Sequence, residues 1–256
     1  MADGSLAGAG SLAGKVSPEE WGARVDLAAL YRLVALFGWD DMIYTHISAR
    51  VPGPEHHFLI NPYGLFFEEI TASSLIKVDL EGQVRQETSS FINPAGFTIH
   101  SAVHAAREDA QFVMHLHTDQ GVAVAAQKEG LLPLSQHALI IRPSLAYHDY
   151  EGIALNHEER DRLVADLGDK AVMLLRNHGT LAVGKTAGDC WTAMFYLERA
   201  CKQQVMALSA GRENVLLASQ ASQDAVRGQV RGGMGGALAW PGCLRRLDRR
   251  SPGYDA

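Results

Sequence analysis

Histidines at the ends of apolar segments are the residues of this sequence best suited to chemistry. The chain has 256 residues and 11 histidines, and His115 and His117 form a His-x-His pair in the apolar run 112–117. If this run is a β-strand, both side chains point to one face, because strand side chains alternate with a period of two. Two such imidazoles can bind one metal ion, with nitrogens about 2.0–2.1 Å from it. Taken alone, the pair is equally compatible with two half-buried core histidines.

A third histidine, His178, strengthens the metal interpretation. It lies at the end of another apolar strand and is followed by Gly179, whose conformational freedom would allow a sharp turn that exposes the preceding side chain. Three imidazoles from two strands would form a cap with open coordination positions opposite. Catalytic metal sites need such positions, whereas structural sites are closed. The pattern therefore favours a catalytic metal held by His115, His117 and His178.

Other histidines have weaker claims. His100 and His104 are spaced four apart and share a helix face, but no third ligand accompanies them, so packing or polar contacts are favoured. His148 lies in a run of proton-transfer groups, Tyr147 to Gly152, and such polar runs often line sites because loops carry function. His46 lies on an alternating strand, and spacing does not identify its partners. His157 opens a charged helix, and we expect no function for it.

The elements that must position these residues alternate between strands and helices. Ser17, Pro18 and Glu20 form a helix start, and Gly38 ends that helix. The patterns predict helices at 18–37, 97–107, 121–129, 156–167 and 186–210, and strands at 44–51, 57–61, 75–80, 112–117, 138–147 and within 171–184. This alternation is typical of a layered α/β domain. We expect a flexible tail at 1–15, the domain at 16–212, and a C-terminal extension or interface arm at 213–256.

Composition excludes several classes of function. The net charge of −6 argues against a nucleic-acid partner, and no apolar run approaches the roughly 20 residues needed to span a bilayer. The N-terminus lacks the basic region of a signal peptide. Three cysteines without metal-ligand spacing favour a reducing, cytoplasmic location.

Taken together, these segments resemble the class II aldolase/adducin family from about Trp21 to Ala210. The segment His115-Leu116-His117-Thr118 resembles the family's first metal motif, and Asn177-His178-Gly179 resembles its second. The resemblance implies a three-layer α/β/α domain with a mixed, mostly antiparallel central sheet. It also implies one divalent ion per subunit (Mn, Zn, Co, Fe or Mg) on His115, His117 and His178. It further implies a homo-oligomer, a tetramer or larger, with the site near a subunit interface.

Two departures from the family pattern narrow the chemistry. The Ser-Ser-Glu segment of the sugar-phosphate aldolases falls here on Pro94-Ala95-Gly96, which offers no phosphate ligand and no proton-transfer group. His46 stands where the family's phosphate motif has asparagine. Phosphosugar substrates are therefore disfavoured. The segments 60–64, 92–96 and 147–152 instead resemble an adducin-like enzyme branch that includes metal-dependent decarboxylases of hydroxylated aromatic or heteroaromatic carboxylates.

The expected function is thus a divalent-metal-dependent carbon–carbon lyase. A decarboxylase is favoured over an aldolase of non-phosphorylated substrates. The metal would stabilise an enolate or phenolate as the bond breaks, and a histidine would protonate the carbanion. The candidates are His148 and His46 for proton transfer, Tyr147 and Tyr150 for orientation, Arg50 for a second carboxylate, and Asn93 for substrate binding.

Two alternatives stay open. A non-heme Fe(II) oxygenase on the same three histidines would perform an oxidative decarboxylation. Since ferrous sites commonly pair two histidines with a carboxylate, Asp119 would supply that group if the strand 112–117 continued. A non-catalytic, adducin-like binding module is the other alternative, although adducin's own domain departs from the metal motif that this chain retains.

Overall fold

The computed structural model describes residues 11–152, 159–230 and 235–256. Residues 1–10, the start of the expected helix 156–167 and His157 lie outside this part of the chain. Within it, one sheet of seven strands has the order β3-β2-β1-β4-β7-β6-β5. The strands are β1 (His46–Arg50), β2 (Phe58–Ile60), β3 (Ile76–Val78), β4 (Phe112–Leu116), β5 (Leu145–His148), β6 (Val172–Leu175) and β7 (Gly179–Gly184).

The sheet is mixed and mostly antiparallel, as expected. Only β5 and β6 pair in parallel, whereas the other neighbouring strands run antiparallel. In the register between β1 and β4, His46 lies opposite His115. Directly opposite residues share a face of the sheet, so these two side chains point the same way.

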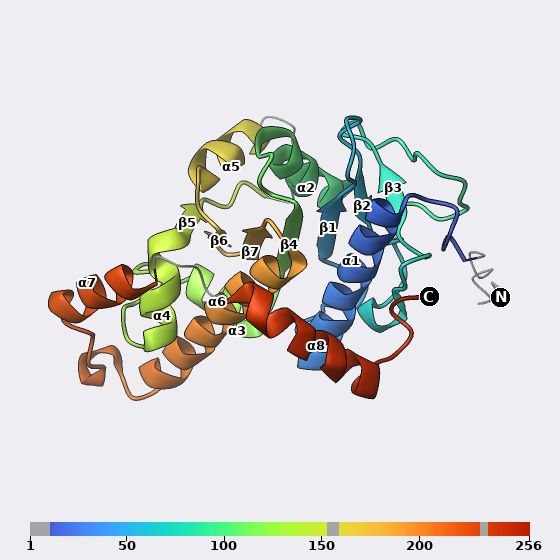
Figure 1. Ribbon diagram of the computed structural model, residues 1–256. Helices are drawn as coiled ribbons and strands as arrows, with labels where there is room; N and C mark the ends of the chain where they lie inside the picture. The colour runs from blue at the N-terminus through green and yellow to red at the C-terminus, as the bar shows by residue number, and fades with distance from the viewer. Residues whose placement is uncertain (1–10, 153–158, 231–234) are drawn as a thin grey trace, which may run out of the picture.

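Helices cover both faces of the sheet, which gives the predicted three layers (Figure 1). One face carries α1 (Pro18–Phe37), α3 (Asp119–Ala125), α4 (Gln136–Ile141), α6 (Ala187–Leu208) and α8 (Gly236–Arg250). The other face carries α2 (Pro94–Ala106) and α5 (Glu159–Leu167). Each face has its own apolar core, because alternate strand residues point to opposite layers: Met114 and Leu116 lie in one core and Val113 in the other.

The long helices α1 and α6 both begin at side-chain caps, and the cap of α1, Ser17, is the one that the sequence predicts. The Ser17 side chain accepts a hydrogen bond from Glu20 N, and α1 ends at Gly38 with φ 66°. The Thr186 side chain likewise accepts from Asp189 N at the start of α6. These side chains satisfy amide groups that a helix end leaves without partners.

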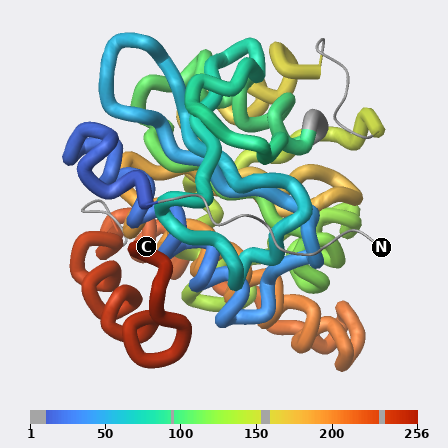
Figure 2. The backbone as a smooth tube through the Cα atoms, turned by 90° about the vertical axis from the view of Figure 1, so that its right-hand side faces the viewer, coloured from blue at the N-terminus to red at the C-terminus, as the bar shows by residue number. Residues whose placement is uncertain are grey.

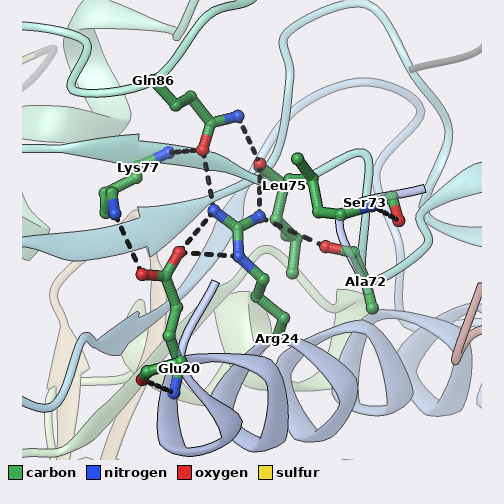
Figure 3. Close-up of polar contacts among 9 residues, drawn as sticks. Glu20, Arg24, Ala72, Ser73, Leu75, Lys77 and Gln86 are labelled. Atoms are coloured by element: carbon green, nitrogen blue, oxygen red, sulfur yellow. Dashed lines mark hydrogen bonds and ion pairs between the residues drawn. The ribbon is translucent and has the colours of Figure 1, made fainter. Parts of the chain in front are cut away.

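A polar cluster fixes the N-terminal turns of α1 to the segment that carries β3 (Figure 3). The fully buried Arg24 donates to Glu20 Oε1 at 2.9 Å, to Leu75 O at 2.9 Å and to Gln86 Oε1 at 2.7 Å. Lys77 Nζ donates to the other oxygen of Glu20 at 2.9 Å. The buried guanidinium therefore has both a counter-charge and hydrogen-bond acceptors, which burial of a charge requires.

The expected strand at 138–147 is wrong over its first part. Residues 136–141 form α4, the short 3₁₀ helix Arg142–Ser144 follows, and β5 begins only at Leu145. The Ser135 side chain accepts from Ala138 N and so caps α4, and Pro143 has no amide hydrogen for a sheet ladder. The apolar run 138–141 fits a buried helix as well as a strand, and periodicity alone does not distinguish the two.

The C-terminal region contains two further helices despite its weak periodicity. They are α7 (Gln220–Gln229) and α8, which lies beside α1 and α6 (Figures 1 and 2). Trp240 Nε1 donates to Asp26 Oδ1 at 3.1 Å, and Leu247 is completely buried. The last residues return to the N-terminal half, where Ser73 N donates to Ala256 O at 2.9 Å. Residues 236–256 thus pack on their own domain; a role of 213–256 as an interface arm stays a prediction.

Candidate metal centre

Three histidines from neighbouring strands meet at one end of the sheet. His115 belongs to β4, His117 follows it, and His178 lies in the turn between β6 and β7. Because Leu116 pairs with Thr180 across β4 and β7, the end of β4 lies beside the turn that precedes β7. One ligand nitrogen from each histidine lies within 4.8 Å of the others. The geometry suits a single cation shared by the three rings.

The turn that presents His178 depends on two neighbours. Asn177 adopts the left-handed conformation with φ 56°, which asparagine tolerates better than most residues. Gly179 is not in that region, so the sharp turn expected from its freedom comes from Asn177 instead. Gly179 is needed for space, because a Cβ there would lie 2.4 Å from Leu116 O and 3.1 Å from the ring of His117.

Two hydrogen bonds fix the protons of the ligand histidines. His115 Nδ1 lies 3.0 Å from Thr180 O, and His117 Nδ1 lies 3.0 Å from Asp41 Oδ2. A carbonyl and a carboxylate both accept, so each Nδ1 carries the hydrogen and each Nε2 keeps its lone pair. The two Nε2 atoms are 3.1 Å apart. Two lone pairs at that separation repel, and a cation between them would convert the repulsion into coordination.

The electrostatics keep two of these imidazoles, those of His115 and His178, neutral. Burial, together with the nearby His178 and His117, lowers the pKa of His115 well below its usual value. Burial, with His117 and His148, lowers the pKa of His178 to about 4. Neutral imidazole is the form that binds metal. The described residues therefore fit a divalent metal ion, and three imidazoles suit Zn, Co, Fe or Mn better than Mg, which prefers oxygen ligands.

A cavity of about 390 Å³ opens in front of the three histidines. Its walls are largely aromatic, and the described residues that line it include no lysine or arginine. The lining residues are Tyr44, Thr45, His46, Tyr63, Asn93, Gly96, Ile99, His115, His117, Tyr150, Gly152 and His178.

Two polar groups of the cavity wall, the His46 ring and the Thr45 hydroxyl, have no hydrogen-bond partner among the described residues. His46 is 4% exposed, and neither of its ring nitrogens is bonded to any of these residues. Burial, with a smaller effect of His117, lowers its pKa to about 3, so the ring is neutral. A buried polar group without a partner costs free energy. A substrate atom in the cavity would provide the missing hydrogen bond.

Comparison with known proteins agrees with this geometry. The sequence profile of the family described as Class II Aldolase and Adducin N-terminal domain matches residues 25–205. The chain belongs to this family. It is 75% identical, over 99% of both chains, to a protein of Caulobacter vibrioides provisionally named an aldolase class 2 protein. It is also 47% identical to alpha-adducin of Mus musculus over 199 residues, which are 76% of this chain and 27% of that protein.

A solved structure shares the whole fold of this class II aldolase and adducin family member. The crystal structure of an aldolase II superfamily protein from Pseudomonas syringae has a TM-score of 0.92 and 52% sequence identity. The match covers 96% of this chain and 100% of that chain. The resemblance inferred from the motifs, and the mixed sheet between helical layers, are thereby confirmed.

The structure brings only some of the predicted site residues to the cavity of this family member. His46, Asn93 and Tyr150 line it. Arg50 lies at the other end of β1 from His46, where its guanidinium donates to His104 O. The distance along the strand, roughly 3.3 Å per residue, keeps Arg50 from the three histidines.

Tyr147 and His148 are likewise absent from the described cavity wall. They alternate along β5, and the Tyr147 hydroxyl accepts from Leu131 N at 3.0 Å while Arg176 lies over its ring. His148 is buried with Nδ1 2.7 Å from Asp166 Oδ2. His100 and His104 both bond to Ser48 Oγ, at 2.6 and 2.7 Å, in agreement with the polar contacts expected for them.

Asp119 does not join the three histidines. The strand ends at Leu116, and Thr118 caps α3, so Asp119 enters the first turn of that helix and lines a different cavity. The carboxylate that does contact a ligand histidine is Asp41. It is 76 residues away from His117 along the chain and lies in the loop after α1, so no local sequence pattern identified it.

Proposed function

We propose that this family member is a divalent-metal-dependent carbon–carbon lyase that decarboxylates a hydroxylated aromatic or heteroaromatic carboxylate. The same proposal includes the aldol cleavage of a non-phosphorylated substrate, because that reaction passes through the same kind of carbanion. The observation that carries it is the combination of three converging imidazoles with an aromatic cavity that has no lysine or arginine among its described lining residues.

The cavity wall supports this class of substrate. A phosphate dianion is usually recognised by arginine, lysine or clustered backbone amides, and the described wall contains neither cationic side chain. Tyr44, Tyr63 and Tyr150 instead offer aromatic surface and hydroxyl groups, which suit a planar ring with polar substituents. A carboxylate and an adjacent hydroxyl of such a substrate would face the three histidines.

The residues of the chain divide the remaining work between them. A divalent metal on His115, His117 and His178 would polarise the substrate oxygen and stabilise negative charge as the bond to carbon dioxide breaks. His46 would hydrogen-bond the substrate at a ring nitrogen and, as a neutral ring, relay a proton from solvent to the developing carbanion by accepting at one nitrogen and donating from the other. Tyr150 and Asn93 would orient the substrate, whereas the positions of Arg50, Tyr147 and His148 give them no contact with it.

The Fe(II) oxygenase alternative loses its expected carboxylate. Asp119 points into another cavity, and the Asp41 carboxylate is engaged with His117 Nδ1. An all-histidine donor set is shared by Zn, Co, Fe and Mn, so the metal is proposed from among these. The dependence of turnover on oxygen separates the lyase from the oxygenase.

The similarity to alpha-adducin favours a second candidate function, a binding module without turnover. This chain retains three converging imidazoles and a cavity with an unpartnered histidine, which a surface used only for protein binding does not require. We therefore place the enzyme first. Stoichiometric metal with no turnover on any hydroxy-aromatic carboxylate would favour the binding module.

The proposed partners are small carboxylates and further copies of the chain. We propose a homo-oligomer, a tetramer or larger, with the cavity near a subunit interface, and a cytoplasmic location. Among the described helices, none is long and apolar enough to cross a bilayer, and the net charge of −6 disfavours nucleic acid. The proposal therefore includes neither a membrane nor a nucleic acid as a partner.

Elemental analysis of the purified protein, followed by a carbon dioxide release screen, tests the proposal. We expect about one divalent ion per chain and release of carbon dioxide from hydroxy-aromatic carboxylates, equally with and without oxygen. His115→Ala should lose both the metal and the turnover, because two imidazoles hold a divalent ion far less tightly than three.

His137→Ala is the matched control, since His137 lies on α4 against Gln203 and Tyr196 and away from the cavity. This variant should keep both metal and turnover. Full turnover of a metal-free preparation would disprove the metal-dependent mechanism.

A further inference from the structure

A buried carboxyl group on α6 bonds to two residues that lie next to the ligand histidines in the sequence. Glu198 is 3% exposed. Its Oε2 accepts a hydrogen bond from Thr118 Oγ1 at 2.5 Å, and its Oε1 accepts one from Thr180 Oγ1 at 2.9 Å. Both oxygens of one side chain are therefore used, and each is bound to a different strand segment.

These two threonines belong to the segments that carry the ligand histidines. Thr118 follows His117 directly, and its hydroxyl also accepts from Gly121 N at 3.0 Å, which caps α3. Thr180 lies two residues after His178, and its backbone oxygen is the acceptor that fixes His115 Nδ1. Glu198 thus bridges the end of β4 and the start of β7 at the point where all three ligands emerge.

Packing alone does not explain a carboxyl group at this position. Its buried neighbours on α6, Met194, Leu197 and Cys201, are apolar and belong to the core against the sheet. Burial raises the pKa of Glu198 to about 7 against the smaller effect of the two threonine hydrogen bonds. An apolar residue would fill the space without the cost of desolvating this group. What it would lack is a fixed link to both threonines.

We infer that Glu198 is a positioning residue that clamps the two ligand-bearing segments together and thereby sets the metal affinity of the three histidines. The inference rests on the metal site of the proposed function. Glu198 links helix α6 to that site through Thr118 and Thr180, and the ligand histidines themselves do not supply this link. Residues that orient metal ligands commonly change metal affinity by about 10- to 100-fold when replaced.

Metal binding by Glu198→Gln tests the inference. The glutamine has the same shape, but its amide nitrogen can only donate, so one threonine hydroxyl must turn from donor to acceptor and that link is weakened. We expect Zn²⁺ to bind about tenfold more weakly, at the low end of that range because Glu198 acts through its neighbours. The dissociation constant is measured by competition with a chromophoric chelator, and the unfolding temperature of the metal-free protein is measured in parallel.

Gln204→Leu is the matched control. Gln204 is also fully buried on α6 and also bonds through both ends of its amide, but to Leu132 N, Gln127 and Gly130 O rather than to the ligand segments. This variant should lower the unfolding temperature and leave Zn²⁺ affinity unchanged. A parallel loss of Zn²⁺ affinity in both variants would show a general effect of stability and would overturn the inference.

The Thr180 hydroxyl provides a second, independent test. Thr180→Val removes one arm of the bridge while keeping the backbone acceptor of His115, so Zn²⁺ affinity should fall as in Glu198→Gln; Thr180→Ser keeps the hydroxyl and should restore it. Wild-type affinity in both Glu198→Gln and Thr180→Val would overturn the inference alone. A wild-type protein that binds none of Zn²⁺, Co²⁺, Fe²⁺ and Mn²⁺ would overturn the proposed function itself.

Discussion

Gly96 shapes the cavity because the absence of a side chain at this position leaves space for the His46 ring. A Cβ at this position would lie 2.2 Å from Nδ1 of His46 and about as close to the neighbouring ring atoms. The His46 ring therefore occupies the space in front of residue 96. The two residues depend on each other, since this histidine conformation is compatible only with glycine at 96. In this chain, a larger residue at 96 would require a different residue or rotamer at 46.

Gly96→Ala should displace the His46 ring while leaving the metal ligands in place. A contact of 2.2 Å cannot persist, so the ring must rotate into the cavity; overpacking of this kind costs about 1–3 kcal/mol. We expect normal metal content and a lower unfolding temperature. Turnover should fall at least about tenfold, because a positioned proton-transfer group typically contributes more than that to the rate.

The control for this substitution is Gly228→Ala on α7. A Cβ there meets nothing within 4 Å, and alanine is the better helix former by about 0.5–1 kcal/mol. Stability should therefore be unchanged or slightly higher. If Gly96→Ala retained full turnover on a substrate of the wild-type protein, the His46 ring would have no part in the reaction.

At the scale of elements, the first helix is attached to the sheet by a charge cluster that should make stability depend on pH. Burial alone would raise the pKa of Glu20, but the hydrogen bonds and charges of Lys77 and Arg24 outweigh burial and lower that pKa below 4.5. The unfolded chain then binds a proton more readily than the folded one, so Glu20 stabilises the fold above about pH 4.5. This contribution is lost as the pH falls through the folded pKa.

Glu20→Gln should therefore be most destabilising near neutral pH. It leaves Arg24 buried without its counter-charge, which costs about 3 kcal/mol, or roughly 6–12 °C of unfolding temperature for a chain of this size. Thermal unfolding at a series of pH values should show this difference narrowing below about pH 4.5. Glu19→Gln, in the same turn but exposed, should match the wild type. A difference that is constant with pH would contradict the assigned role of ionised Glu20.

Features that depend on residues close together in the sequence were predictable, whereas contacts between residues far apart in the sequence were not. The Ser17 cap and the His-x-His pair act within a few residues, so spacing was sufficient to place them. The carboxyl groups of Asp41 and Glu198 reach the metal centre from 76 and 80 residues away along the chain. Their partners are set by the order in which strands and helices pack, which no local pattern contains. Packing across the sheet likewise sets the position of Arg50, which lies away from the cavity against His104 O.

At the scale of the whole molecule, the C-terminal helix α8 is the element whose role was hardest to predict from sequence periodicity. Its apolar positions are interrupted by glycine, by Pro241 and by arginines, and this weakens the helical pattern. Leu247 nevertheless joins the main core, while Leu238 on the same helix is 89% exposed. The close approach of α8 to α6 requires small residues, because a Cβ at Gly188 would lie 2.8 Å from Gly236 O. The described contacts of α8 are therefore with the core and helices of its own domain.

Leu247→Ala distinguishes this structural role from that of an arm used only between subunits. Truncating a fully buried leucine costs about 2–5 kcal/mol, so the unfolding temperature should fall by roughly 4–20 °C. Leu238→Ala, on the exposed side of α8, should change stability by less than about 0.5 kcal/mol. Thermal unfolding and size-exclusion chromatography of both variants test this. A Leu247→Ala protein that unfolds at the wild-type temperature but elutes as a smaller assembly would show that α8 stabilises the oligomer rather than the subunit.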